Sequence, residues 1–468
     1  MPDATNAANH PTSDAGHDAA SPPGAAGPQH PAAAGPVHPG AASPIHPAAA
    51  SPAVPNATPA DTALAAQYEA YPYPKRDPRD EAKRLIIGSP SHLREIDHWV
   101  FAAARPRSQP LRALVAGGGT GDGAIMLAQH MARDQRPGSV TYLDRSAAAM
   151  AVARARADAR NLTLDWHQGS LLDLPQSGLG PFDYIDCCGV LHHLPDPAEG
   201  LHALLSVLAP GGGLGLMLYA PHGRTGVYML QDALRLLAPP DQPPPDRLDT
   251  ARRVMRHLPE TAWLRRNTNF GDHIEGGDAG LYDLLLNPRD RAYTVPDLFA
   301  FLQTAGLHPA ALMEPLRYDP AAYLPDPRLR ARLAALGPAA RAALAEGLTG
   351  NMSTHVIYAV RTTEPRPAPD PMRPDAIPIA REISAAELAR NIRPDGTLPF
   401  LFDGLRVPVP LPPLAAAILG QIDGTRTVAE IAAALQTRGT TPETFARAWR
   451  ATYDALSSVN RILLAAPP

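Results

Sequence analysis

The chain has little of several features that would narrow its class. Among 468 residues it contains two cysteines and 5% aromatic residues, and its net charge is only −4. The two cysteines, Cys187 and Cys188, are adjacent, which excludes an ordinary structural disulfide between them and a cysteine-rich metal site. We therefore expect a reducing compartment, the cytoplasm, and no metal centre.

Charge and hydropathy exclude two further classes. A weak negative net charge gives no general attraction to nucleic acid or to an acidic membrane surface. No apolar run reaches the ~18 residues of a membrane span, and the first residues lack the apolar core of a secretion signal. We expect neither a membrane nor a nucleic acid as partner.

Proline, in contrast, is abundant. The 55 prolines are more than twice the average share, and they are concentrated near the two ends of the chain. Residues 1–60 consist mainly of Ala, Pro, Gly, Ser and His, with an eight-residue repeat beginning at His30, His38 and His46. Such a tract cannot bury a core, so we predict a disordered tail. Its histidines could bind metal, but the pattern favours a solvated tail because no carboxylate or cysteine is fixed beside them.

The stretch from Leu111 to Gly123 organises the rest of the chain. An apolar run of the kind found in strands buried on both faces passes directly into Gly117, Gly119 and Gly121. Residues 122–131 then have helical spacing of their apolar side chains, so the turn leads into a helix whose first amides are free. Glycines at the turn permit positive φ and leave room for a ligand.

Two cofactors fit this loop. The spacing Gly119-x-Gly121-x-x-Ala124 satisfies the relaxed dinucleotide fingerprint, and the tighter Gly117-x-Gly119-x-Gly121 is typical of S-adenosylmethionine (SAM) binding. About twenty-five residues later a second strand-like run, 140–144, ends in Asp144. A carboxylate there can accept both ribose hydroxyls of either cofactor, so these residues alone leave both open.

Three later motifs separate the two cofactors. They are the G-x-x-x-D-L-P segment at 169–175, the F-D-Y-I…G-V-L-H-H-L strand at 182–194 and the L-A-P-G-G-G turn at 208–213. With the glycine loop and Asp144, this order resembles the class I SAM-dependent methyltransferases. The resemblance implies an α/β fold with a Rossmann-like, doubly wound, seven-stranded sheet that ends in an antiparallel pair, for which 307–313 and 355–361 are the candidates.

The resemblance also implies which residues contact SAM. In this sequence they are Gly117, Gly119, Gly121, Asp144, Arg145, Ser170, Leu171, Asp173, Cys188, Tyr68 and Tyr73. The two tyrosines belong to a segment that many relatives fold over the cofactor, although an aromatic-proline clasp on the domain surface explains them nearly as well. Val115 and Ser170 stand where many relatives carry acids, which weakens two polar contacts to the cofactor.

His192 and His193 follow the fourth strand, where the methyl acceptor should approach. A histidine there could remove the acceptor's proton because its ordinary pKa lies near neutral. The alternative, which we favour, is that the imidazoles bond the backbone and shape the pocket, since methyl transfer depends more on alignment than on acid-base chemistry.

An insertion at residues 221–296 is expected to form a lid over the acceptor. Within it, His273 with Asp272, Glu275 and Asp278 could bind a divalent cation, but a polar loop is the favoured interpretation. Arg289 and Arg291 could bind an acidic acceptor or pair with Asp283 and Asp290.

The sequence thus predicts a methyltransferase domain over 61–363, a proline-rich linker over 364–378 and a small, mainly helical, winged-helix-like module over 379–468. Balanced charges make DNA binding by the module less favoured than protein contact or dimerisation. The expected activity is methyl transfer from SAM to an O, N or C nucleophile of a small-molecule acceptor. The competing hypothesis is a regulator that binds SAM without turnover and acts through its C-terminal module.

Overall fold

The computed structural model describes residues 59–268 and 271–467. The predicted tail, with its His-Pro repeat, lies outside the described residues except for its last two positions. All of the described residues belong to one compact unit. Among the described residues, none of the helices combines the length and the hydropathy needed to cross a bilayer.

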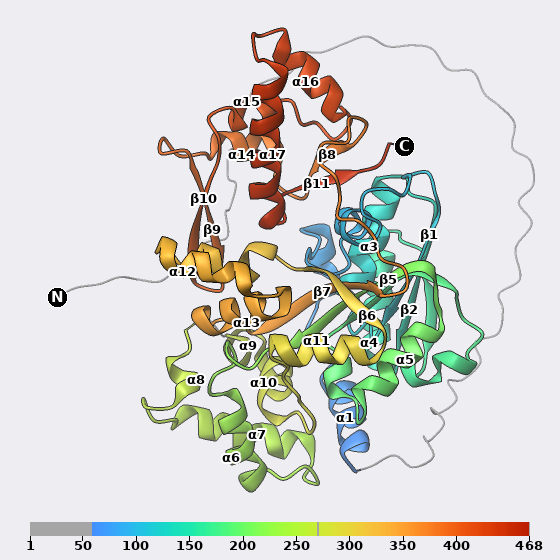
Figure 1. Ribbon diagram of the computed structural model, residues 1–468. Coiled ribbons are helices and arrows are strands. Elements are labelled where there is room, and N and C mark those ends of the chain that lie inside the picture. Colours follow the sequence, from blue (N-terminus) through green and yellow to red (C-terminus); the bar gives the residue numbers. More distant parts are fainter. Residues whose placement is uncertain (1–58, 269–270, 468) are drawn as a thin grey trace, which may run out of the picture. The chain divides into compact units, whose positions relative to one another are not determined.

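This unit contains a seven-stranded sheet, seen in Figure 1. Its strand order is β3-β2-β1-β4-β5-β7-β6. The strands are β1 Leu111–Ala116, β2 Gly138–Asp144, β3 Asp165–Gln168, β4 Phe182–Cys188, β5 Leu208–Tyr219, β6 Leu307–Leu312 and β7 Thr354–Arg361. The first five run parallel, whereas β7 lies antiparallel between β5 and β6. The predicted Rossmann-like sheet with a final antiparallel pair is confirmed.

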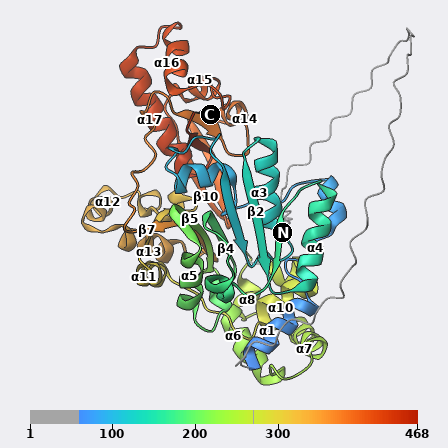
Figure 2. The ribbon, with the colours of Figure 1, turned by 90° about the vertical axis from the view of Figure 1, so that its right-hand side faces the viewer.

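Alternating side chains on β1 explain why helices cover both faces of the sheet. Ala113 and Val115 belong to the core under α3 (Asp122–Arg133) and α4 (Ala147–Ala159). Their neighbours Leu114 and Ala116 belong to the core under the helices of the opposite face. Those helices are α5 Pro197–Ser206 and α11 Val295–Thr304, and Figure 2 shows the sheet between the two layers. The apolar run of β1 is therefore buried on both sides, as its composition predicts.

The predicted insertion consists mainly of helices. They are α6 Val227–Leu237, α7 Pro244–Arg256, α8 Trp263–Arg266, α9 Asp272–Glu275 and α10 Gly277–Leu286. The expectation of a loop at 271–278 was wrong, because α9 and the start of α10 occupy it. The left-handed φ of Gly277, +60°, turns the chain between these helices, and the buried apolar residues of α10 hold the second one in place.

Two strand boundaries also differ from expectation. The strand-like run at 162–166 predicts a third strand there, but Asn161 takes a left-handed φ of 54° and Leu162 packs against the core, so the ladder begins at Asp165. The turn predicted at 208–213 is the first half of β5, because Leu208 and Gly213 pair with the neighbouring β4.

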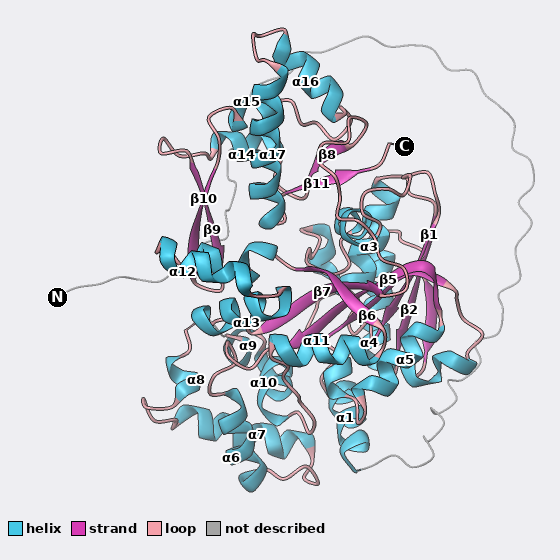
Figure 3. Cartoon of the chain, viewed as in Figure 1, coloured by secondary structure: helices cyan, strands magenta, loops and turns pink. Residues whose placement is uncertain are grey.

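The remaining α-helices and strands of the described residues are α1 Pro59–Ala70, α2 Leu93–Glu95, α12 Pro327–Arg332, α13 Pro338–Thr349, β8 Ile377–Ala380, α14 Ala385–Arg390, β9 Thr397–Phe402, β10 Leu405–Pro410, α15 Ala415–Leu419, α16 Val428–Gln436, α17 Pro442–Ser458 and β11 Ile462–Ala465. The C-terminal segment thus contains two separate strand pairs, β8 with β11 and β9 with β10 (Figure 3). Trp449 of α17 is fully buried in its core and its indole donates to the Pro371 carbonyl at 2.6 Å. The winged-helix-like assignment of this module stays a prediction.

Candidate functional site

The glycine loop lies between β1 and α3 in a conformation that side chains disfavour. Gly117, Gly119 and Gly121 have φ values of +76°, +52° and +102°. A Cβ on Gly117 would fall 2.3 Å from a Val190 methyl, and one on Gly119 would fall 2.8 Å from the Tyr73 carbonyl oxygen. Left-handed backbone and close packing therefore both require glycine.

Asp144 lies at the carboxyl end of β2, directly against this loop. Its Oδ2 accepts the Gly119 N–H at 2.8 Å, and its Oδ1 accepts the Ser146 N–H at 2.8 Å. Burial raises the pKa of Asp144, and the bonds from Ser146 and Gly119 oppose that rise. An ionised carboxylate has about four acceptor positions, so both oxygens retain capacity for a ribose diol. The adjacent Arg145 is exposed.

The 169–175 segment forms a short 3-10 helix, Leu171–Gln176, at the carboxyl end of β3. Ser170 and Asp173 form a capping box at its start: the Ser170 hydroxyl accepts the Leu172 N–H at 3.2 Å, and Asp173 Oδ2 accepts the Ser170 N–H at 3.3 Å. Leu171 is buried against the α5 side of the core. Ser170 and Asp173 therefore fix the segment, and the second Asp173 oxygen keeps acceptor capacity.

Residues 71–76, the strap, lie against the glycine loop. The Tyr73 carbonyl faces Gly119, and the Thr120 hydroxyl donates to the Pro74 carbonyl at 2.7 Å. Arg76 pairs with Asp122, the first residue of α3, at 2.6 Å. The strap thus covers the loop through its backbone. The hydroxyl of Tyr68, which precedes the strap, donates to Asp283 instead.

The end of β4 brings Cys188 and the two histidines to the carboxyl edge of the sheet. Cys187 is buried, Cys188 is exposed, and both are free thiols. Neither ring nitrogen of His192 has a hydrogen-bond partner among the described residues, and its ring lies 4.0 Å from that of Tyr219. Burial, then His193 and Arg224, lower the pKa of His192 well below its ordinary value. His192 is therefore neutral and a weak base.

His193 has a different environment. Its Nδ1 lies 2.7 Å from the Arg289 carbonyl, so Nδ1 carries the proton that it donates to that oxygen. In the neutral ring this leaves Nε2 with the lone pair. The ring centroid of Tyr68 lies 6.4 Å from that of His193, which places one predicted cofactor residue beside one predicted catalytic residue.

Asp283 of α10 is a functional candidate that the sequence reasoning missed. It accepts hydrogen bonds from the Tyr68 hydroxyl at 2.9 Å, the Tyr219 hydroxyl at 3.2 Å and the Gln67 amide at 3.3 Å. Burial raises the pKa of Asp283, and burial followed by Asp283 raises that of Tyr68. The signal was present: one acid interrupts the apolar run of residues 281–286.

The pairing considered for the two arginines of the insertion is different in the structure. Arg289 bonds Asp61 at 2.7 Å, and Asp290 pairs with Arg224 at 3.0 Å. The Arg291 guanidinium lies 4.9 Å from the centroid of the Tyr293 ring. Arg289 thereby connects α1 to the insertion.

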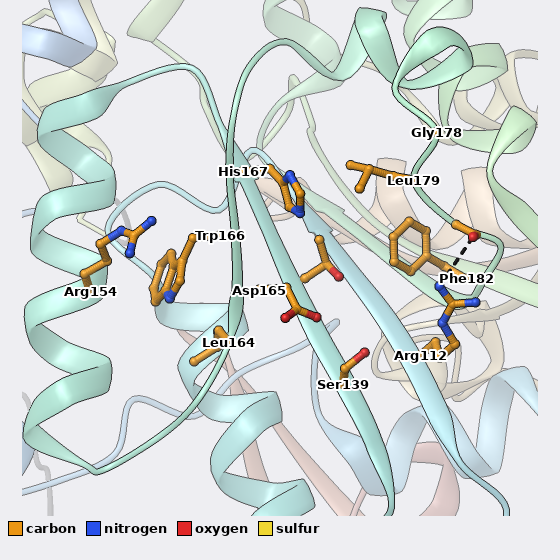
Figure 4. Close-up of a pocket in the computed structure, with 12 residues that line it drawn as sticks. Arg112, Ser139, Arg154, Leu164, Asp165, Trp166, His167, Gly178, Leu179 and Phe182 are labelled. Carbon is orange, nitrogen blue, oxygen red and sulfur yellow. Dashed lines mark hydrogen bonds between the residues drawn. The ribbon is translucent and has the colours of Figure 1, made fainter. Parts of the chain in front are cut away.

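A separate cavity, drawn in Figure 4, lies near the amino ends of the parallel strands, whereas the glycine loop lies at their carboxyl ends. Its volume is about 460 Å³, and its lining includes Arg112, Ser139 and Asp165, which stand at or near the amino ends of β1, β2 and β3. Ligands of open α/β sheets bind at the carboxyl ends of the strands. The candidate site is therefore at the carboxyl ends of the strands, beside the glycine loop.

Residues 114–214 match the family model described as a methyltransferase domain. This span contains the glycine loop, Asp144, the Ser170–Asp173 cap and both histidines. The chain carries a class I SAM-dependent methyltransferase domain.

Known proteins are similar in sequence to this chain over part of their length. An uncharacterised protein of Synechococcus sp. is 32% identical over 254 residues, which cover 52% of this chain and 58% of that protein. The ubiquinone biosynthesis O-methyltransferase of Azotobacter vinelandii is 31% identical over 152 residues, covering 32% of this chain and 60% of that enzyme. The chain thus spans less than two thirds of the length of the curated relatives it matches.

A solved structure has a similar fold. PKMT2 from Rickettsia typhi, in complex with AdoHcy, matches with a TM-score of 0.55 and 15% identity, covering 81% of this chain and 75% of that chain. A second structure of PKMT2 from Rickettsia typhi gives a TM-score of 0.53 at 13% identity, covering 78% of this chain and 74% of that chain. At this low sequence identity, the similarity shows only that the two proteins share a fold.

Proposed function

We propose that this chain transfers a methyl group from SAM to an O, N or C nucleophile of a small-molecule acceptor. The observation that carries the proposal is the 2.8 Å hydrogen bond from the Gly119 N–H to the Asp144 carboxylate. Both residues lie in the segment that matches the methyltransferase domain. When bound, SAM would supply a methyl group that the acceptor's nucleophile attacks in line, with the C–S bond breaking and S-adenosylhomocysteine leaving as a neutral thioether.

The residues present fit this cofactor. Gly117 and Gly119 keep the backbone open where side chains would collide with Val190 and the strap, and Asp144 offers acceptors to the ribose. Ser170, Leu171 and Asp173 form a rigid edge for the adenine, with Asp173 as the acceptor for its amino group. Tyr73, Cys188 and Arg145 complete the proposed contacts, and Tyr68 acts through its bond to Asp283.

The acceptor is proposed to enter at the carboxyl end of β4. There His193 holds a lone pair on Nε2, because Nδ1 is committed to the Arg289 carbonyl, so His193 can take a proton from a hydroxyl or an ammonium group. His192 is neutral and packs against Tyr219, so it shapes the pocket. The insertion that carries Asp283 and Arg289 would select the acceptor.

We also propose that the chain acts in the cytoplasm, since its cysteines are free thiols in the structure. The module at 379–468 is proposed to contact protein, including a second copy of this chain. The domain limits 61–363, with a lid at 221–296, and the linker at 364–378 remain part of this proposal.

Calorimetric titration with SAM, S-adenosylhomocysteine and NAD in turn tests the cofactor. We expect micromolar binding of the first two, and about 10- to 100-fold weaker binding in Asp144→Asn, because hydrogen bonds to a charged group contribute roughly 1.5–3 kcal/mol. Asp158→Asn, an exposed acid on α4, is the matched control and should bind as the parent does. A preference for NAD would instead support the dinucleotide fingerprint at Gly119 to Ala124.

One observation favours the second candidate, a regulator that binds SAM without turnover. Val115 and Ser170 replace acids of many relatives, and here Val115 is buried in the core while Ser170 caps a helix. Incubation with labelled SAM and small molecules of a cell extract distinguishes the two. A labelled product that is absent with His193→Asn supports the enzyme, and SAM binding without any product supports the regulator.

A further inference from the structure

Two buried histidines and a carboxylate meet outside the methyltransferase site. His92 precedes α2, His130 belongs to α3, and Glu382 follows β8. One potential ligand atom from each lies within 4.8 Å of the others. The histidines are 0% and 1% exposed, and their ring centroids are 4.4 Å apart. Residues far apart in the sequence therefore present two imidazoles and one carboxylate to a common point.

His130 lacks the partners that a buried imidazole needs. Within the described residues neither of its ring nitrogens has a hydrogen bond. A buried polar group without a partner is destabilising, so such groups are rare in folded proteins and need an explanation. In the neutral ring, one of the two nitrogens carries a lone pair that no described residue engages.

Glu382 is held in position by its neighbours. The Arg94 guanidinium donates to the Ala380 carbonyl and, at 3.1 Å, to that of Arg381. The Arg381 guanidinium in turn pairs with the buried Glu95. The residues before Glu382 are thus tied to α2, and its carboxylate reaches His92 Nε2.

The surrounding charges allow a cation. Three arginines lie near the three residues. Arg133 acts on His130 and pairs with Asp134 at 2.7 Å, whereas Arg381 and Arg94 interact with Glu382, and Arg381 also pairs with Glu95. Glu382 and Asp134 act on His130 with the opposite sign. The Glu382 carboxylate thus places an acidic group beside both imidazoles.

We propose that His92, His130 and Glu382 bind one Zn²⁺ ion, with a fourth position for water. Two imidazole nitrogens and one carboxylate oxygen form a ligand set that zinc accepts in tetrahedral geometry. His130 lies about 12 Å along α3 from Asp122 and the glycine loop, so this ion is separate from the proposed SAM site. The sequence reasoning expected no metal centre.

Zinc binding requires one change in the His92 ring. Its Nδ1 accepts the Arg94 N–H at 3.2 Å, which places the ring proton on Nε2. Coordination through Nε2 moves that proton to Nδ1, which breaks the hydrogen bond from the Arg94 N–H. The metal ion then takes the place of the hydrogen bond between His92 Nε2 and Glu382. Zinc would then link the segment after β8 directly to α2 and α3.

The test is metal binding by the full-length protein with the tail histidines replaced by alanine. Those residues are His10, His17, His30, His38 and His46. After removal of bound metal with a chelator, the protein is titrated with Zn²⁺ by calorimetry and with Co²⁺ by visible absorption. We expect one equivalent of each metal, the d–d bands of four-coordinate cobalt, and a higher unfolding temperature with zinc.

Two variants and two controls decide the assignment. Glu382→Gln and His130→Asn should each weaken zinc binding at least tenfold, because even loss of a group that only orients a ligand weakens metal affinity by 10- to 100-fold. Glu387→Gln and His202→Asn alter exposed residues of α14 and α5 and should bind as the parent does. Glu382 is partly exposed, so its variant tests the site even where His130→Asn fails to fold. Absence of one-equivalent binding, or unchanged affinity in Glu382→Gln, would overturn the proposal.

Discussion

Arg156→Met removes a buried guanidinium while keeping much of the side-chain volume. Arg156 of α4 is 1% exposed. Its Nε bonds Glu81 at 2.6 Å, and its Nη1 bonds Asp122 at 2.6 Å and the Thr120 carbonyl at 2.8 Å. This one side chain therefore joins α4 to the glycine loop and to the chain that precedes β1.

The magnitude follows from what the variant leaves behind. Removing one partner of a buried ion pair costs about 3–5 kcal/mol of unfolding free energy, because the other charge stays buried. Glu81, with a side chain 3% exposed, keeps Arg160, and Asp122, 27% exposed, keeps Arg76. We therefore expect the lower end of that range, about 3 kcal/mol.

Urea denaturation followed by tryptophan fluorescence measures this loss. The matched control is Arg253→Met, which breaks a pair with Asp249 whose side chains are 69% and 53% exposed. Exposed pairs contribute roughly 0–1 kcal/mol, so the control should unfold nearly as the parent does. Equal stability of Arg156→Met and Arg253→Met would refute the reasoning that the buried network stabilises the loop.

Two further changes have defined outcomes. Gly117→Ala places a methyl group 2.3 Å from Val190 at a φ of +76°, so we expect a loss of about 1–3 kcal/mol in denaturation and weaker SAM binding in calorimetry, and an unaltered protein would contradict the packing described for the loop. Burial raises the pKa of Asp186 from 3.8 to about 6, so the native state holds a proton that the unfolded chain releases. The stability from this group is complete below about pH 4 and is lost as the pH rises through 6, which amounts to about 3 kcal/mol. Asp186→Asn should remove that loss, so its unfolding free energy relative to the parent should increase between pH 4 and pH 7.5, and parallel pH profiles would contradict this.

Much of the fold could be predicted because its signals are local. The apolar run before Gly117 marks a doubly covered strand, and the glycines mark the turn that follows. The spacing of Thr427 and Glu430 is that of a capping box, and the two residues form one at the start of α16. Each of these signals depends on residues within a few positions of one another.

Other elements had no local signal. Strands β8 and β11 have four residues each and are separated by about eighty residues, so only their pairing makes them strands. The start of β3 depends on a left-handed Asn161, which periodicity does not show.

Some contacts of the candidate sites could likewise be predicted from nearby residues, and others could not. The glycines form one short loop and Asp144 ends the next strand along the chain, and the structure joins Gly119 to Asp144 by a hydrogen bond. In contrast, Asp283 meets Tyr68 across more than two hundred residues, and His92 meets Glu382 across an even longer separation. Such contacts arise from tertiary packing, and a single sequence does not reveal them.

The pairing of β8 with β11 has a consequence for synthesis. A ribosome adds roughly 5–20 residues per second, so β8 emerges about 4–16 seconds before its partner is made. During that interval Ile377 and Ile379, both buried in the finished protein, have no β11 to cover them. The core shared by β8 and β11 is therefore completed only after translation has passed β11.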